Sequence, residues 1–204
     1  MIGLNEMIAE LRPEEVEWRR LSSIARRNGG TPITAGSMRT LHVDGGPIRV
    51  FAAGATIADV TEDAVPPGDV IREPSIIVKS RGRIGFTFYD KPFTHKNELW
   101  SYTITDPDVD QRFVYYYLLT QVAHLEALAR ASSVKLPQLN VGQIDGIIVP
   151  VPPLKLQKEL VKLLDKFTAL QAELEAELEA ELEARRAQYE HYREQLLAFK
   201  ELGA

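Results

Sequence analysis

Cysteine is absent from this chain of 204 residues. Its absence excludes disulfide bonds, thiolate metal ligands and a cysteine nucleophile. Histidine is scarce as well, because only His42, His95, His124 and His191 occur, and no two of them have the spacing of a zinc-binding helix. We therefore expect no metal site.

Long apolar runs are also lacking. A helix that crosses a membrane needs about 18 or more apolar residues in succession, and the sequence has no such stretch. The segment Met1–Glu6 lacks the basic region followed by an apolar region that marks a signal peptide. The sequence therefore predicts a cytoplasmic protein that has no membrane partner.

The chain has no excess of positive charge. Its 24 lysine and arginine residues are outnumbered by 29 aspartate and glutamate residues, which gives a net charge of −5. A nucleic-acid-binding domain is usually recognised by a basic surface. Any binding of DNA would therefore depend on a local cluster of cations, and on phosphate contacts that other subunits add.

Catalytic motifs are missing too. The sequence contains no glycine-rich phosphate-binding loop, no G-x-S-x-G nucleophile motif and no recognisable set of nucleophile, histidine and acid. It also lacks the carboxylate pattern of a metal-dependent nuclease. We do not expect an enzyme.

One long helix is the dominant feature of what is present. From Pro153 to about Lys200, apolar residues recur in steps of three and four, and no glycine follows until Gly203. About 47 residues at 1.5 Å each would form a rod of roughly 70 Å. Its apolar stripe is too long to be covered by one compact domain, so we expect it to pack on another long helix. The residues expected in this apolar seam are Leu160, Leu163, Phe167, Leu170, Leu174, Leu178, Leu182, Tyr189 and Leu196.

The middle of the helix is a tetrapeptide repeat. Residues 171–182 read Gln-Ala-Glu-Leu, Glu-Ala-Glu-Leu and Glu-Ala-Glu-Leu. A spacing of four residues shifts the stripe in the opposite direction to a heptad, so the repeat behaves as a stutter in a supercoil. The glutamates between the leucines are expected to form a solvated face.

The remaining residues predict a β-rich domain over residues 1–153. Short apolar or β-branched segments alternate with glycine and proline turns. We expect strands or extended segments at 15–21, 48–51, 70–71, 75–79, 84–89, 99–104 and 147–151. Helical segments are expected at 3–11, at 22–27 and after Asp106–Asp110, where Phe113, Tyr116, Tyr117, Leu119 and Leu125 would face the core. The fold class is therefore α+β, a domain with flanking helices followed by the long helix over residues 154–204.

A small basic cluster is the main candidate for binding. Lys79, Arg81 and Arg83 stand beside glycines at a turn between two expected strands, and His95, Lys96 and Asn97 follow one hairpin later. Glycine allows the backbone to approach a phosphate, and arginine and lysine can reach guanine edges. The alternative is a solvated hairpin tip with no ligand.

Two segments of small residues are further candidates. Gly54 and Thr56 lie in a loop in which a duplex could come close, and Gly30 and Thr31 lie in a Gly-Gly-Thr-Pro break. Ordinary turn packing explains these segments equally well. We include all four residues among the expected DNA contacts.

Taken together, these segments resemble the specificity subunit of type I restriction–modification systems. Residues 8–21 are similar to the entry of the family's target-recognition domain, and residues 47–54, 74–85 and 92–93 follow the pattern of that domain. The most specific likeness is Leu136-Pro137-Gln138-Leu139 through Gln157, which resembles the exit into the conserved spacer helix. Residues 186–197 are typical of that helix, in which tetrapeptide repeats also occur.

The resemblance implies a function. A full member of the family has two recognition domains and two spacer helices, whereas this sequence has one of each, as a half subunit would. We then expect an antiparallel homodimer, in which each domain reads half of an interrupted palindromic site on double-stranded DNA. In the family, DNA methyltransferase (modification) subunits bind along the helices and carry S-adenosylmethionine, and restriction subunits can join them. This chain would bind no cofactor.

One alternative from another class stays open. A cytosolic coiled-coil adaptor, whose β domain binds a protein, would explain the acidic balance. Salt-dependent binding to DNA in the presence of a methyltransferase subunit distinguishes the two functions.

Overall fold

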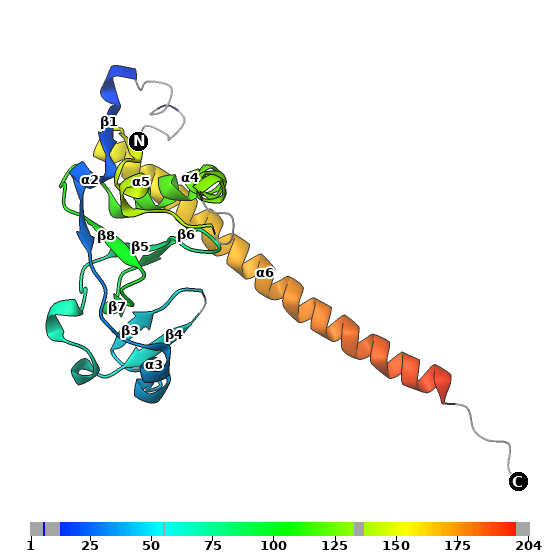
Figure 1. Ribbon diagram of the computed structural model, residues 1–204. Coiled ribbons are helices and arrows are strands. Elements are labelled where there is room, and N and C mark those ends of the chain that lie inside the picture. The colour runs from blue at the N-terminus through cyan, green and yellow to red at the C-terminus, as the bar shows by residue number, and fades with distance from the viewer. Residues whose placement is uncertain (1–5, 7–12, 55, 133–136, 199–204) are drawn as a thin grey trace, which may run out of the picture. The chain divides into compact units, whose positions relative to one another are not determined.

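The computed structural model describes residues 6, 13–54, 56–132 and 137–198. The helix expected over residues 3–11 lies outside the described residues, apart from Glu6. The chain divides into two compact units, Met1–Val161 and Lys162–Ala204. The first is globular and β-rich, and the second consists of most of a long helix (Figure 1). The predicted α+β class, a β-rich domain followed by a long helix, is confirmed.

The globular unit contains three small sheets in its described residues. A two-stranded sheet pairs β1 (Glu17–Arg20) with β9 (Ile148–Val151), so the two ends of the unit lie side by side. The four-stranded sheet has the order β2 (Ala25–Asn28), β8 (Trp100–Ile104), β5 (Ser75–Lys79) and β6 (Gly85–Tyr89). The three-stranded sheet has the order β4 (Ile57–Val60), β3 (Ile48–Phe51) and β7 (Phe93–His95).

Helix α4 (Gln111–Ser132) covers the four-stranded sheet, where it packs against β5 and β6. The carboxylate of Asp110 begins the helix, because it accepts hydrogen bonds from the backbone N–H groups of Arg112 and Phe113 at 2.9 and 3.0 Å. Leu125 is buried as expected, whereas Leu119 is 39% exposed. The helix places Val114 and Leu118 in the core instead.

A second core lies between the three-stranded sheet and α3 (Ala35–Leu41). Met38 of α3 packs with apolar side chains of β3 and β4 in this cluster. Arg49 and Asp59 form a bidentate ion pair across the two strands, with N–O distances of 2.7 and 2.9 Å. The sequence did not predict α3, β4 or β7, because each is short and lacks a clear apolar period.

The shorter elements connect these layers. Helix α2 (Leu21–Ile24) covers part of the segment 22–27 in which a helical turn was expected, and β2 covers the rest. The remaining short elements are η1 (Pro13–Glu15), α2 (Leu21–Ile24), η2 (Glu62–Ala64), η3 (Pro67–Asp69) and α5 (Val141–Asp145). Asn140 and Gln143 form a capping box that begins α5.

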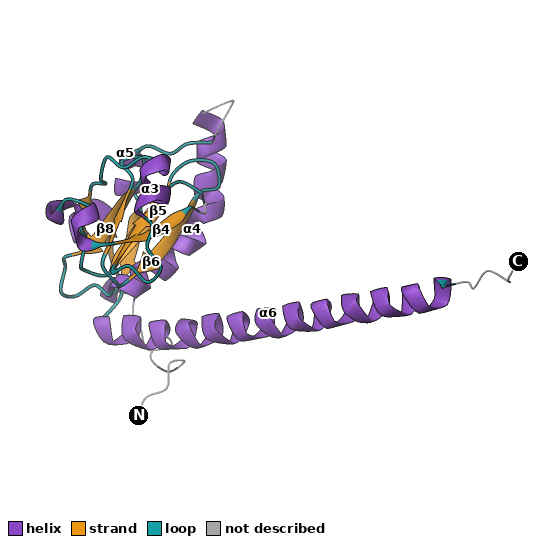
Figure 2. Ribbon diagram, turned by 90° about the horizontal axis from the view of Figure 1, so that it is seen from below, coloured by secondary structure: helices purple, strands orange, loops and turns teal. Residues whose placement is uncertain are grey.

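Helix α6 (Leu154–Leu197) is a single uninterrupted helix of 44 residues, as Figure 2 shows. Its first two turns belong to the globular unit, because Leu156, Gln157 and Val161 are buried. Gln157 donates from Nε2 to the carbonyls of Asp108 and Pro152 at 3.0 and 2.7 Å. Its Oε1 accepts from the backbone N–H of Asp110 at 2.8 Å. One side chain therefore joins the start of α6 to the start of α4.

The rest of α6 exposes its apolar side chains. Within the single chain, Leu163 is 38% exposed, Phe167 59% and Leu196 75%. None of the helices among the described residues is long and apolar enough to cross a membrane.

We predict that Gln157→Leu destabilises the globular unit by about 2–4 kcal/mol, because two carbonyls and one N–H lose their partner inside the core. Urea unfolding followed by tryptophan fluorescence measures the change, since Trp18 and Trp100 both lie in the globular unit. Gln171→Leu makes the same substitution at an exposed position of α6 and should leave the midpoint unchanged. Equal midpoints for both variants would show that Gln157 does not anchor the helix.

Candidate nucleic-acid interface

The basic cluster forms the turn between β5 and β6. Lys79 is the last residue of β5, and Arg81 and Arg83 are exposed on the turn. Gly82 has a φ of 69°, a backbone conformation that favours glycine. Backbone hydrogen bonds join the turn to residues 137–139. The Gly82 N–H donates to the carbonyl of Pro137 at 3.0 Å, and the Leu139 N–H donates to the carbonyl of Ser80 at 2.9 Å. The cations therefore stand on a fixed backbone.

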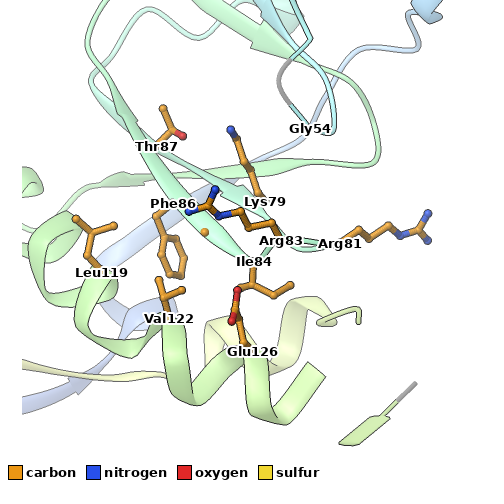
Figure 3. A pocket seen from close by; sticks show the side chains of 11 residues that line it. Gly54, Lys79, Arg81, Arg83, Ile84, Phe86, Thr87, Leu119, Val122 and Glu126 are labelled. Carbon is orange, nitrogen blue, oxygen red and sulfur yellow. The ribbon is translucent and has the colours of Figure 1, made fainter. Parts of the chain in front are cut away.

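A cleft of about 590 Å³ opens beside this turn. Figure 3 shows Lys79 and Arg83 extending over it, whereas Arg81 points away from its centre. We call this feature the cationic cleft. Its lining residues are Gly54, Lys79, Arg81, Arg83, Ile84, Gly85, Phe86, Thr87, Leu119, Val122 and Glu126. The site thus combines a cationic rim with an apolar wall from β6 and α4, and with one carboxylate, which pairs with Arg130 at 3.2 Å.

The cations of the cleft are not neutralised by carboxylates. Among the described residues, Lys79, Arg81 and Arg83 take part in no ion pair. Other arginines differ in this respect. Arg26 pairs with Glu73, and Arg27 pairs with Asp145 at 2.8 Å. The sequence alone could not distinguish arginines that pair with a carboxylate from those that do not, because the carboxylates of Glu73 and Asp145 come from distant segments.

Gly54 also lines the cleft, although it lies in a turn of the three-stranded sheet. It has a φ of 78° in the turn between β3 and β4, which the Ala52 N–H closes by donating to the Thr56 carbonyl at 3.1 Å. Thr56 is exposed in the same turn. The structure therefore brings Gly54 together with Lys79, Arg81 and Arg83, which the sequence could only treat as separate loops.

The other expected contacts lie around a crossing of strands. The Thr31 N–H donates to the carbonyl of His95 at 2.7 Å, and the Lys96 N–H donates to that of Phe51 at 2.9 Å. Gly30 is required for this packing, because a Cβ there would lie 2.5 Å from the His95 carbonyl oxygen. Thr31 is only 2% exposed and His95 is fully buried. The side chains of both residues are therefore interior, contrary to their expected role as surface contacts.

His95 is held neutral by its surroundings. Its Nε2 lies 3.2 Å from the Ser101 hydroxyl, and its Nδ1 lies 3.3 Å from the carbonyl oxygen of Lys96. Burial lowers the pKa of His95 to about 4, so the ring carries no charge for a phosphate at neutral pH. The neighbouring Lys96 pairs with Glu98 at 2.9 Å, which leaves Asn97 as the exposed member of the tripeptide.

Among the described residues, no group of three or more histidine, aspartate or glutamate side chains could hold a metal ion. The arrangement is suited to binding a polyanion through fixed cations.

Comparisons with known proteins point to one family. The family model described as "Type I restriction modification DNA specificity domain" matches residues 13–184. The specificity subunit of the EcoprrI type I restriction enzyme of Escherichia coli is 31% identical over 206 residues, covering 92% of this chain and 51% of that protein. A relative in Haemophilus influenzae is 33% identical over 204 residues, with 95% and 49% coverage. The chain spans about half the length of the curated relatives it matches.

A solved structure has the same fold. The crystal structure of the type I restriction–modification S subunit of M. genitalium aligns with a TM-score of 0.61 at 20% identity. The alignment covers 90% of this chain and 46% of that one. At this identity, the likeness extends to the fold alone.

We predict that the stability of the globular unit falls by about 2 kcal/mol between pH 7 and pH 5 on account of His95. The unfolded chain binds a proton on this residue below its ordinary pKa of 6.5, whereas the folded chain does so only near pH 4. Stability is therefore lost as the pH falls through this window. Urea unfolding at both pH values, with and without the substitution His95→Gln, measures the effect. An equal pH dependence in the two proteins would contradict a buried neutral His95.

Proposed function

The chain belongs to the type I restriction–modification DNA specificity family, and from this premise we propose that its globular unit recognises a short DNA sequence through the cationic cleft. The observation that carries the proposal is the set of cations on the β5–β6 turn, Lys79, Arg81 and Arg83, which no carboxylate in the described residues neutralises. Family membership supports the class of function, and the unpaired cations of the cleft support its proposed location on this chain.

The chemistry of the cleft fits duplex DNA. Fixed lysine and arginine side chains bind phosphates, and arginine can also pair with guanine through two hydrogen bonds. Gly54 brings a backbone without a side chain to the same rim, where a phosphate could approach closely. Thr56 and Asn97 are exposed polar residues that can extend the contact surface. Gly30, Thr31 and His95 support the strands behind it.

The chain is expected to bind DNA weakly by itself. Its net charge of −5 repels the phosphate backbone at long range, and the cleft holds only a few cations. We therefore propose that it acts in a complex with DNA methyltransferase subunits, and with restriction subunits where these are present. Methyl transfer and cleavage belong to those partners, so this chain supplies recognition and binds no cofactor.

The exposed part of α6 is the basis of a second proposal, which concerns dimerisation. The apolar seam runs over residues that are about half exposed or more from Phe167 onwards. A stripe of this kind is stable in water only when another helix covers it. We propose an antiparallel homodimer, in which two globular units are held apart and each reads one half of an interrupted palindrome.

We predict that Arg81→Ala and Arg83→Ala each weaken binding of the assembled complex to mixed-sequence duplex DNA by about 5- to 10-fold, because each loses one phosphate contact. The slope of log K against log salt should fall by about 1 for each variant, for the same reason. Fluorescence anisotropy at several salt concentrations measures both quantities.

Arg39→Ala is the matched control for this experiment. Arg39 is exposed on α3, and no residue of α3 lines the cleft. Its loss should change neither affinity nor slope. Unchanged affinity at low salt for both cleft variants would remove the cleft from the interface. If the complete complex bound no DNA in a salt-dependent way, the adaptor function would be favoured instead.

We predict that the purified chain sediments as a dimer, at twice its mass of 22.9 kDa, at micromolar concentration. Leu174→Lys with Leu178→Lys should give monomers, because each of these leucines contributes about 1.5–3 kcal/mol when buried. Ala176→Lys with Ala180→Lys adds the same charge on the opposite side of the helix and should leave the dimer intact. A wild-type chain that sediments only at 22.9 kDa would refute the homodimer.

A further inference from the structure

The apolar positions of α6 are spaced symmetrically about Ala176. Counting backwards from Ala176, five seam residues stand 2, 6, 9, 13 and 16 positions away. Counting forwards, apolar side chains stand at 2, 6, 13 and 16 positions, and an arginine stands at 9. The backward set is Leu174, Leu170, Phe167, Leu163 and Leu160. The forward set is Leu178, Leu182, Arg185, Tyr189 and Tyr192. A helix that packs on an unrelated helix has no need of this symmetry.

Symmetric spacing is what an antiparallel pair of identical helices requires. In such a pair, each residue at the centre of the seam faces the residue that lies equally far on the other side of the two-fold axis, whereas a residue on the flank beside the axis faces its own copy. We propose that α6 pairs with a second copy of itself with the two-fold axis at Ala176, which deepens the homodimer of the proposed function and rests on it. Leu174 then faces Leu178 of the other copy, Leu170 faces Leu182, and Leu163 faces Tyr189.

The one charged residue in the symmetric set distinguishes antiparallel from parallel pairing. Arg185 stands 9 positions after Ala176, and Phe167 stands 9 positions before it. The antiparallel pair therefore places each guanidinium against a phenyl ring, a favourable contact for arginine. A parallel pair would place Arg185 against Arg185 inside the seam, where two like charges would be partly desolvated.

A shifted antiparallel register is the main competitor. With the axis at Leu170, this leucine would face its own copy, whereas Leu174 would face Lys166 and Leu163 would face Glu177. That register leaves Tyr189 and Tyr192, which are 65% and 53% exposed in the single chain, beyond the paired region. Leucines that face charged side chains bury less apolar surface than leucines that face apolar ones, so the longer overlap about Ala176 is favoured.

The favoured register has a cost that can be measured. Glu175 and Glu177 flank the seam on its two sides beside the axis, so each faces its own copy across the dimer. Like charges in this position repel one another, and salt screens them. The dimer should therefore tighten when these two carboxylates are neutralised or when the salt concentration rises.

The register also sets how far apart the two globular units are attached. Each unit is anchored on α6 by Gln157, whose side chain is buried in that unit. With the axis at Ala176, the two copies of Gln157 are about 57 Å apart along the helices, at 1.5 Å per residue. With the axis near Leu170 the separation would be about 40 Å.

Cysteine cross-linking of the full-length chain tests the register, because the natural sequence has no cysteine to interfere. Leu170→Cys and Leu182→Cys are prepared separately, one of them with a tag that changes its mass, and are then mixed and oxidised. Residues 170 and 182 face one another only when the axis lies at Ala176. We expect the mixture to give a disulfide-linked heterodimer, and neither variant alone to cross-link.

Every other outcome overturns the register. Cross-linking of Leu170→Cys alone would place the axis near residue 170, and self-cross-linking of both variants would show parallel helices. A dimer by sedimentation without any cross-link would show a different register. A monomer by sedimentation would instead refute the homodimer, and would leave the DNA-binding role of the cleft untouched.

A second measurement uses charge and keeps every seam residue. Glu175→Gln with Glu177→Gln should lower the dimer dissociation constant by about 3- to 10-fold at low salt, and the gain should shrink at high salt. Glu179→Gln with Glu183→Gln removes the same charge away from the axis and should change it by less than about 2-fold. Equal effects of the two pairs would overturn the proposed position of the axis.

Discussion

The apolar stripe of α6 is the constraint on which the rest of the protein depends. Its side chains are exposed on a helix of 44 residues, of which the globular unit buries only the first two turns. An apolar stripe of this length on a helix is typically covered by another helix, which is the basis of the proposed dimer. Gln157 joins the first turn of the helix to the globular unit, through hydrogen bonds to three backbone groups.

The cationic cleft gathers positive charge on a chain that is acidic as a whole. Many surface cations of the globular unit are neutralised by nearby carboxylates, as Arg26 and Arg27 are. The β5–β6 turn keeps its positive charge because no described carboxylate pairs with it. In the proposed function, this charge would direct DNA to one rim, and so few cations favour binding that a larger assembly completes.

Several expectations failed for physical reasons that concern particular residues. His95 was expected to contact DNA beside Lys96, but its ring is buried, which keeps it neutral. Thr31 was expected to contact DNA from a Gly-Gly-Thr-Pro break, whereas its backbone N–H donates a hydrogen bond to the carbonyl of His95. Leu119 was assigned to the core one position too far along, because the apolar stripe of α4 runs through Val114 and Leu118.

The sequence by itself determined the long helix, the α+β class and the family resemblance, because helical periodicity and turn residues act over a few neighbours. It also contained the spacing of the apolar seam. Only the tertiary structure decided which candidate residues share one surface. Gly54 and the Lys79–Arg83 turn come from different sheets, and the carboxylates that neutralise other arginines come from distant segments. Burial and charge pairing arise from contacts between residues far apart in the chain, and no local pattern records them.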